Sequence, residues 1–167
     1  MRGKQMIQQT LILIKPDGIE RGLIGEIIKR FEQRGLKIIG MKMVHVDKEF
    51  AGKHYKEAIA QKHGEHVRNY LTNYLSTNPV IAIAVQGINA IPTVRKIVGN
   101  TYPGEADIGT IRGDFAHASK EYAKEKNQGH NLIHASENEA DAKEEMDLWF
   151  SKDELYNYKL SAEEHFY

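Results

Sequence analysis

Residues 10–18 read Thr10-Leu11-Ile12-Leu13-Ile14-Lys15-Pro16-Asp17-Gly18, and the rest of the chain is best interpreted outward from this stretch. Its first half is an unbroken apolar run, rich in β-branched residues and too short for a helix. Proline and glycine then end the regular structure. We therefore predict a buried strand that ends at Lys15 and is followed by a sharp turn.

The residues that follow complete a β-α-β unit. Apolar residues recur at the i, i+3, i+4, i+7 spacing of an amphipathic helix at Ile24, Ile27, Ile28 and Phe31. Gly35 stands where a glycine commonly ends such a helix. Apolar residues then dominate from Leu36 to Val46, which favours a second strand.

The second half of the chain repeats this alternation after a polar, helical segment. Between Asp47, a residue suited to cap a helix, and Asn78 we expect a helical hairpin with Gly64 at its bend. Ser136 and Glu139 have the spacing of a capping box that would start the last helix. The remaining predicted elements are helices over Tyr55–Ala60, Val67–Leu75, Ile91–Val98 and Ser119–Lys126, strands over Val80–Val85 and Leu132–Ile133, and a helix that carries Ala142, Met146 and Trp149.

This order of elements favours an α+β fold. Its core would be a ferredoxin-like antiparallel sheet of about four strands with helices on one face. The helical hairpin is an insertion into that core, and the segment after Ser151 is a C-terminal extension. We expect residues 1–167 to form a single domain, in which residues 1–8 are a flexible N-terminal extension.

The composition excludes several classes of protein. The chain has 167 residues, with 23 basic and 23 acidic side chains and no cysteine, so it has no structural disulfide or thiolate metal site. A formal net charge of zero argues against a generic nucleic-acid binder. No apolar run approaches the ~18 residues of a membrane helix. We expect a soluble, cytoplasmic protein with no membrane partner and no specific nucleic-acid partner.

Familiar phosphate-binding and metal-binding patterns are missing. The sequence contains neither G-x-x-x-x-G-K-[ST] nor a G-x-G-x-x-G after a strand. His63 and His66 could face one metal ion from a helix, but no third ligand accompanies them in the sequence. A solvated helix junction beside Gly64 is the better interpretation of this pair.

Polar residues at the ends of apolar strands and on the adjoining helices remain as candidates, because such positions are rigidly held yet accessible. They are Lys15, Arg95, Arg112, Asn131, His134 and Glu145. Taken singly, each is more often solvated or structural than functional. His134 differs, because Leu132 and Ile133 bury its approach. The N-terminus of the following helix, which favours phosphate anions, also points nearby.

Four separated segments of the chain resemble nucleoside diphosphate kinases. They are Lys15-Pro16-Asp17-Gly18, Arg21-Gly22-Leu23-Ile24-Gly25-Glu26-Ile27-Ile28, Gly109-Thr110-Ile111-Arg112-Gly113-Asp114-Phe115 and Asn131-Leu132-Ile133-His134-Ala135-Ser136. They occur in the family's order, and the resemblance extends from about Thr10 to the C-terminus. The last two segments together are its most specific part.

The resemblance implies that the γ-phosphate of ATP passes to a ribo- or deoxynucleoside diphosphate by a ping-pong mechanism through a phosphohistidine. His134 matches the family's nucleophile, and Glu145, alongside Ser136, matches the carboxylate that orients it. Lys15 completes the catalytic residues. Imidazole suits the role, because one ring nitrogen can attack while a hydrogen bond holds the other.

The resemblance also implies a nucleotide site without a P-loop. Its residues would be Lys15, Tyr55, Val67, Arg95, Thr101, Arg112 and Asn131. The cationic side chains would contact phosphates, and Lys15 and Asn131 would contact the sugar 3′-hydroxyl. Mg²⁺ is expected to arrive on the nucleotide phosphates. Family members form hexamers or tetramers, and here we expect a homo-oligomer, a hexamer.

Two departures from the family pattern affect this interpretation. The family usually stacks the base on a phenylalanine, whereas alignment places Val67 there. Residues 116–130 form an insertion relative to the common family form, for which we expect an exposed or interface role. The competing interpretation is a non-catalytic ferredoxin-like module that binds nucleotides or RNA, or an assembly paralogue. The sequence has neither a basic excess nor an aromatic stripe for RNA.

Overall fold

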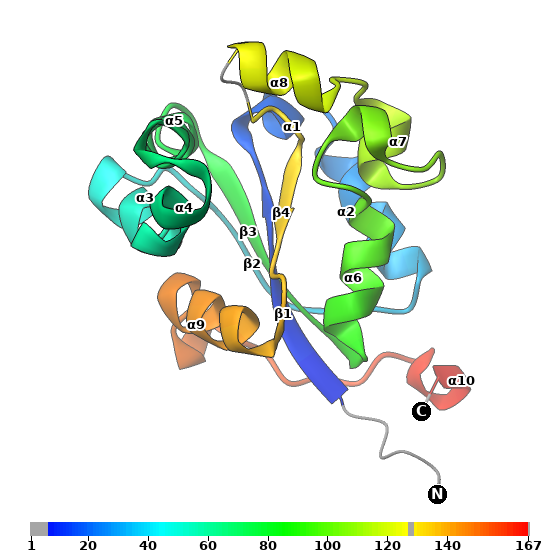
Figure 1. The fold of residues 1–167 in the computed structure, drawn as a ribbon. Coiled ribbons are helices and arrows are strands. Elements are labelled where there is room, and N and C mark those ends of the chain that lie inside the picture. Colours follow the sequence, from blue (N-terminus) through cyan, green and yellow to red (C-terminus); the bar gives the residue numbers. More distant parts are fainter. Residues whose placement is uncertain (1–6, 127–128, 167) are drawn as a thin grey trace, which may run out of the picture.

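A four-stranded antiparallel sheet forms the centre of the computed structural model, which describes residues 7–126 and 129–166 (Figure 1). The strands are β1 (Ile7–Ile14), β2 (Lys37–Val44), β3 (Val80–Ile88) and β4 (Ile133–Ala135). They lie in the order β2-β3-β1-β4, which is the ferredoxin-like arrangement that the sequence predicted. β1 and β3 carry the longest apolar runs, and they occupy the middle of the sheet.

Helices cover both faces of this sheet (Figure 1). One face carries α2 (Ile24–Gln33) and α6 (Ala90–Val98), and the other carries α3 (Lys48–His54) and α9 (Glu139–Trp149). In β1, Ile12 and Ile14 join the first core, whereas Leu11 and Leu13 join the second. The α+β class is confirmed. The prediction of helices on one face only was wrong, because a strand that is apolar on both sides needs cover on both.

The predicted helical hairpin packs against the core of the second face, to which it contributes Leu75, Ile59 and Leu71. It consists of α4 (Glu57–His63) and α5 (Glu65–Leu75). Gly64 joins them with a φ of +97°, a left-handed conformation that favours glycine. Asp47 caps a separate helix, α3, so the predicted helix over Tyr55–Ala60 was misplaced: Tyr55 ends α3, and α4 begins at Glu57.

The remaining elements are short. They are α1 (Pro16–Glu20), η1 (Pro103–Glu105), α7 (Ile111–Phe115), α8 (Lys120–Lys126), η2 (Lys152–Glu154) and α10 (Glu163–Phe166). α8 confirms the short helix predicted in the insertion, of which residues 127–128 lie outside the described residues. The C-terminal extension runs along β2, where the Tyr156 N–H donates to the Ile39 carbonyl at 2.7 Å.

The N-terminal boundary of the sheet differs from the prediction. β1 begins at Ile7, so Ile7 and Gln8 pair with β3 and are not part of a flexible extension. The rest of the predicted extension, residues 1–6, lies outside the described residues. In the described part of the chain, no helix has the length and apolar character that crossing a membrane requires.

Candidate active site

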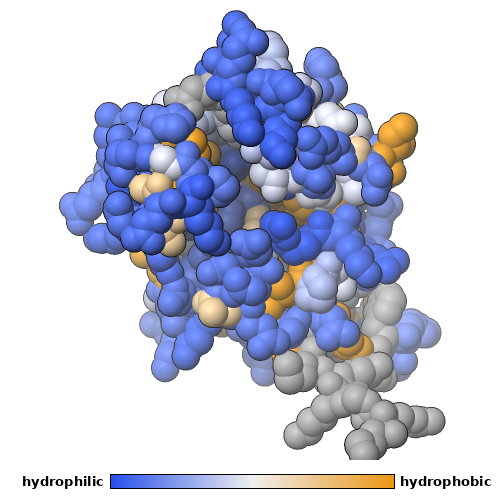
Figure 2. Space-filling view, in the orientation of Figure 1, coloured by the Kyte–Doolittle hydropathy of each residue, from blue (hydrophilic) through white to orange (hydrophobic). Residues whose placement is uncertain are grey.

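The pleat of the sheet brings Lys15 and His134 to one face. His134 lies opposite Leu13 in the β1–β4 pairing, and directly paired residues share a face. Leu11 and Leu13 point into the core under α3 and α9, and Lys15 follows them at the same period of two. In Figure 2, which views the molecule with β4 in front, the surface is mostly hydrophilic and has a hollow between the α4–α5 hairpin and the α7–α8 region.

His134 is anchored on the carboxylate of Glu145. His134 Nε2 lies 2.9 Å from Glu145 Oε2, and Ser136 Oγ donates to the same oxygen at 2.7 Å. An ionised carboxylate can only accept, so Nε2 of the neutral ring carries the proton and Nδ1 keeps a free lone pair. The His134 side chain is 21% exposed, which leaves the ring within reach of a substrate.

Glu145 belongs to the buried stripe of α9. It follows Ala142 by three residues and precedes Met146 and Trp149, and all three neighbours are buried. Burial by itself would raise the pKa of Glu145. Electrostatic attraction to the His134 ring and the hydrogen bond from it, with smaller contributions from His54 and Ser136, instead lower this pKa to about 2. Glu145 is therefore a carboxylate throughout the neutral range.

The predicted capping box at Ser136 is wrong. α9 starts after Asn138, whose side-chain oxygen accepts from the Asp141 N–H at 2.9 Å. Ser136 is fully buried, and its hydroxyl accepts from the Leu11 N–H in addition to its bond to Glu145. Its side chain therefore braces the site and does not cap the helix.

Lys15 and Asn131 form a second polar group. Lys15 Nζ donates to Asn131 Oδ1 at 2.8 Å, and Asn131 Nδ2 donates to the Thr101 carbonyl at 2.8 Å. Burial lowers the pKa of Lys15 to about 7, with help from the charge of Arg112 and partial opposition from Asp17. Lys15 is thus close to its titration midpoint at neutral pH, and an arriving anion would favour its charged form.

The backbone before β4 is held in an uncommon conformation. Leu132 is buried with a φ of +69°, in the left-handed region that residues other than glycine rarely adopt. Its N–H donates to Asp17 Oδ2 at 3.0 Å, and its carbonyl accepts from the Lys15 N–H at 2.9 Å. These bonds to the end of β1 offset the strain and fix the directions of Asn131 and His134.

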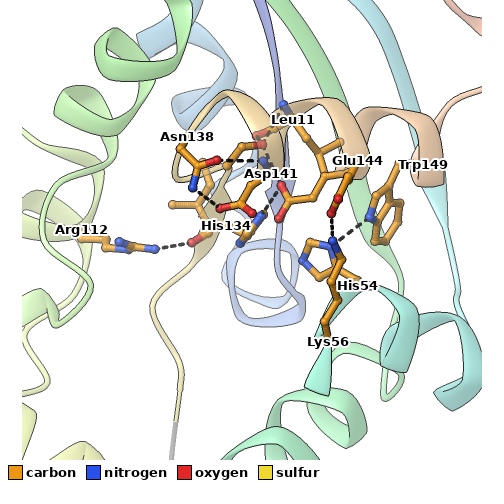
Figure 3. A network of polar contacts seen from close by, with 12 residues as sticks. Leu11, His54, Lys56, Arg112, His134, Asn138, Asp141, Glu144 and Trp149 are labelled. Atoms are coloured by element: carbon orange, nitrogen blue, oxygen red, sulfur yellow. Dashed lines mark hydrogen bonds and ion pairs between the residues drawn. The ribbon is translucent and has the colours of Figure 1, made fainter. Parts of the chain in front are cut away.

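Arg112 acts as a brace in this structure. It is 4% exposed, and it donates at 2.6–3.2 Å to the carbonyls of Gly99, Asn100, Asn131 and Ile133 (Figure 3 labels Arg112). A guanidinium has five N–H groups, so one has no partner among the described residues. Burial and then the nearby charge of Arg95 lower the pKa of Arg112 to about 10, so it stays cationic at neutral pH.

The other residues predicted to contact the nucleotide differ in how far they are buried. Tyr55 is buried, and its hydroxyl has no hydrogen-bond partner in residues 7–126 and 129–166. Burial raises the pKa of Tyr55, and the charges of Glu145 and Arg112 also act on it, so the ring belongs to the same cluster. Arg95 is half-buried on α6, and Thr101 is exposed. Val67 is half-buried on α5 and has no aromatic ring for a base.

Sequence reasoning missed His54. Its ring lies between Trp149 and His134 (Figure 3). It accepts from Trp149 Nε1 at 3.2 Å, and its centroid is 4.5 Å from that of His134. No periodic pattern marked this residue, because it is the last residue of α3, and the predicted helix began one residue later, at Tyr55. Its position just before Tyr55 was the only available signal.

The described residues contain one group of three possible metal ligands, His54, His134 and Glu145. Two imidazole nitrogens and one carboxylate do not fit a resident Mg²⁺, which prefers oxygen ligands. His63 and His66 belong to no such group in this part of the chain. The predicted solvated junction at Gly64 is consistent with their exposed positions.

The fold and the site define a class of protein: an α+β protein with an oriented, partly exposed histidine beside buried cationic side chains, an arrangement suited to binding phosphate groups. The family model for nucleoside diphosphate kinase matches residues 8–155. A nucleoside diphosphate kinase from Borreliella burgdorferi is 47% identical over 165 residues, covering 97% of this chain and 99% of the relative. One from Sulfurisphaera tokodaii is 46% identical and covers 89% of this chain and 92% of the relative.

Solved structures agree with these sequence comparisons. The Borrelia burgdorferi enzyme, solved as a transition-state mimic with bound vanadate and ADP, matches with a TM-score of 0.94 and 45% identity over 98% of both chains. The Halobacterium salinarum enzyme in complex with CDP matches with a TM-score of 0.84 and 35% identity, covering 97% of this chain and 99% of that one. This chain belongs to the nucleoside diphosphate kinase family. The comparisons thus favour an enzyme over the non-catalytic binding module.

Proposed function

We propose that the chain moves the γ-phosphoryl group of ATP to nucleoside diphosphates in two half-reactions, with His134 as the carrier. One observation carries this proposal. The hydrogen bond between His134 Nε2 and Glu145 leaves Nδ1 with a free lone pair on a partly exposed ring.

In the first half-reaction, Nδ1 attacks the γ-phosphorus of ATP. A P–N bond forms, the bond from phosphorus to the β–γ bridging oxygen breaks, and ADP leaves with that oxygen. The ring then carries a phosphoryl group and a positive charge, which the Glu145 carboxylate stabilises. In the second half-reaction, a terminal oxygen of a nucleoside diphosphate attacks the same phosphorus, and the P–N bond breaks. His134 thereby returns to its starting form.

Cationic groups around the histidine support binding of the nucleotide phosphates. The spread negative charge of a transferring phosphoryl group is stabilised by fixed donors and cations. Lys15, Arg95 and the free N–H of Arg112 supply the cations, and Tyr55 and Thr101 supply hydroxyls. Asn131, with Lys15, would contact the sugar 3′-hydroxyl. The solved relatives with ADP and vanadate or with CDP support a nucleotide as the ligand.

Mg²⁺ is part of this proposal as a component of the substrate. The nitrogen-rich group around His134 does not suit it, so the ion would enter on the phosphate oxygens of the nucleotide. Contacts to the sugar and phosphates with little readout of the base would give broad base tolerance, and Val67 offers no ring on which the base could stack. A hexamer, which the family resemblance implies, and a cytoplasmic location complete the proposal.

Labelling tests the proposal directly. The full chain is incubated with γ-labelled ATP and Mg²⁺, and the protein is expected to gain one acid-labile, base-stable phosphoryl group. His134→Ala should gain none. His63→Ala changes an exposed histidine outside the cluster and should label normally. If His134→Ala is still labelled, the nucleophile has been wrongly assigned.

A further inference from the structure

His54 is a buried imidazole whose protonation can be read from its partners. The residue is 5% exposed, and its Nδ1 faces Trp149 Nε1 at 3.2 Å. An indole N–H can only donate, so Nδ1 of His54 must be the unprotonated nitrogen. The proton of the neutral ring therefore lies on Nε2. This Nε2 is buried and has no hydrogen-bond partner among the described residues.

The surroundings of His54 keep the ring neutral. Burial lowers the pKa of His54 well below its usual value, and the charges of His134, Lys15 and Lys56 lower it further, against the opposing effect of Glu145. A neutral, buried N–H without a partner is costly to leave unsatisfied. A buried polar group needs a partner at some stage, and a role in the reaction is one reason for such a group to stand ready.

His54 lies close to Glu145, the carboxylate that holds His134. The His54 and His134 rings meet edge to face at an interplanar angle of 85°. One nitrogen of each ring and one oxygen of Glu145 lie within 4.8 Å of one another. In Figure 3 one ring nitrogen of His54 is turned to Trp149, and the other faces His134.

We infer that His54 is a positioning residue whose Nε2–H group donates a hydrogen bond to the Glu145 carboxylate. Oε2 of Glu145 already accepts from His134 and Ser136, so Oε1 is the natural acceptor. A carboxylate has acceptor sites for several donors. This bond holds the carboxylate in place while His134 carries the phosphoryl group. The inference rests on the proposed function of His134.

Two amide variants separate the two ends of the ring. His54→Gln places an amide nitrogen near the original Nε2, so it keeps a donor toward Glu145. His54→Asn reaches only the position of Nδ1, so it can accept from Trp149 but loses that donor. His63→Asn is a control at an exposed histidine on α4. Each variant is measured for kcat, for the KM of ADP, for phosphoenzyme formation and for Tm.

The donor makes a specific prediction for these measurements. His54→Asn should lower kcat about tenfold with little change in KM, because a hydrogen bond to a charged group is lost. His54→Gln, which keeps the donor, should retain most of the wild-type kcat. Both variants should still become labelled by γ-labelled ATP, only more slowly. If wild type and the His63→Asn control also fail to become labelled, the proposed function itself is contradicted.

Two results would overturn the inference. One is an unchanged kcat in His54→Asn, and the other is an equal loss in both amide variants, which would indicate packing alone. Nitrogen-15 NMR of the full chain gives an independent readout, because His54 should be neutral with its proton on Nε2 between pH 6 and pH 8. A proton on Nδ1 would also refute the assignment. Tm separates any loss of folding from loss of the donor.

Discussion

Replacing Glu145 with glutamine should change both catalysis and the pH dependence of stability. The side chain is 13% exposed and receives hydrogen bonds from His134 at 2.9 Å and Ser136 at 2.7 Å. Glutamine keeps the shape but loses the charge that stabilises a positive imidazole. A hydrogen bond with a charged partner is stronger than a neutral one by roughly 1–2 kcal/mol. We expect kcat of Glu145→Gln to fall about tenfold or more.

The stability effect follows from the pKa of Glu145. Its value falls from 4.5 to about 2 on folding, so the stabilisation is fully present above the unfolded value of 4.5. It is lost as the pH falls through the folded value. A shift of this size corresponds to about 3 kcal/mol, of which about 2 kcal/mol should be lost by pH 3. Urea unfolding of wild type and Glu145→Gln at pH 6 and pH 3 measures this difference.

Glu144→Gln is the matched control, one residue away on the same helix. Glu144 pairs with Lys56 at the surface, and its side chain is 58% exposed. Exposed ion pairs contribute ~0–1 kcal/mol, so this variant should follow the wild-type pH dependence. If the free energy of unfolding of Glu145→Gln falls between pH 6 and pH 3 by as much as that of wild type, another group causes the fall and the reasoning fails.

Two further predictions concern the buried cations. Folding lowers the pKa of Lys15 from 10.5 to about 7, so between these two values the unfolded chain binds more protons than the folded one. The free energy of unfolding should therefore rise between pH 7 and pH 10, by up to about 1.4 kcal/mol per pH unit. Lys15→Met should lack this rise in urea titrations, and exposed Lys62→Met should keep it; an unchanged rise in Lys15→Met would assign it elsewhere. Arg112→Lys should lower the free energy of unfolding by about 3 kcal/mol, because lysine cannot satisfy the carbonyls that Arg112 joins. A change no larger than that of exposed Arg34→Lys would show that Arg112 is not a brace.

The residues of the candidate site could be predicted from the sequence to different degrees. Lys15 and His134 could be placed from the sequence because each stands at or next to an apolar run, and strand alternation then puts them on one face. Glu145 could be found as a charged residue inside the apolar stripe of a helix. Arg112 was expected to meet phosphate, but most of its donors bind backbone carbonyls. A motif identifies such a residue without saying where its hydrogen bonds go.

Local pattern determined much of this protein by itself. The apolar runs and the helix spacings are set by neighbouring residues, so they define the strands, most helices and the ferredoxin-like order. The four motifs were sufficient to indicate the family. The unbroken apolar run Leu11–Ile14 also places apolar side chains on both faces of β1, which by itself implies cover on both sides.

Only the tertiary structure decided which side chains surround His134. His54 meets Trp149 across a sequence separation of 95 residues, and Ser136 reaches Leu11 across 125. Contacts of this kind depend on how helices pack over the sheet, and no local periodicity encodes them. The burial that sets the pKa values of Lys15 and Glu145 arises in the same way, because water is excluded only when distant segments close over them.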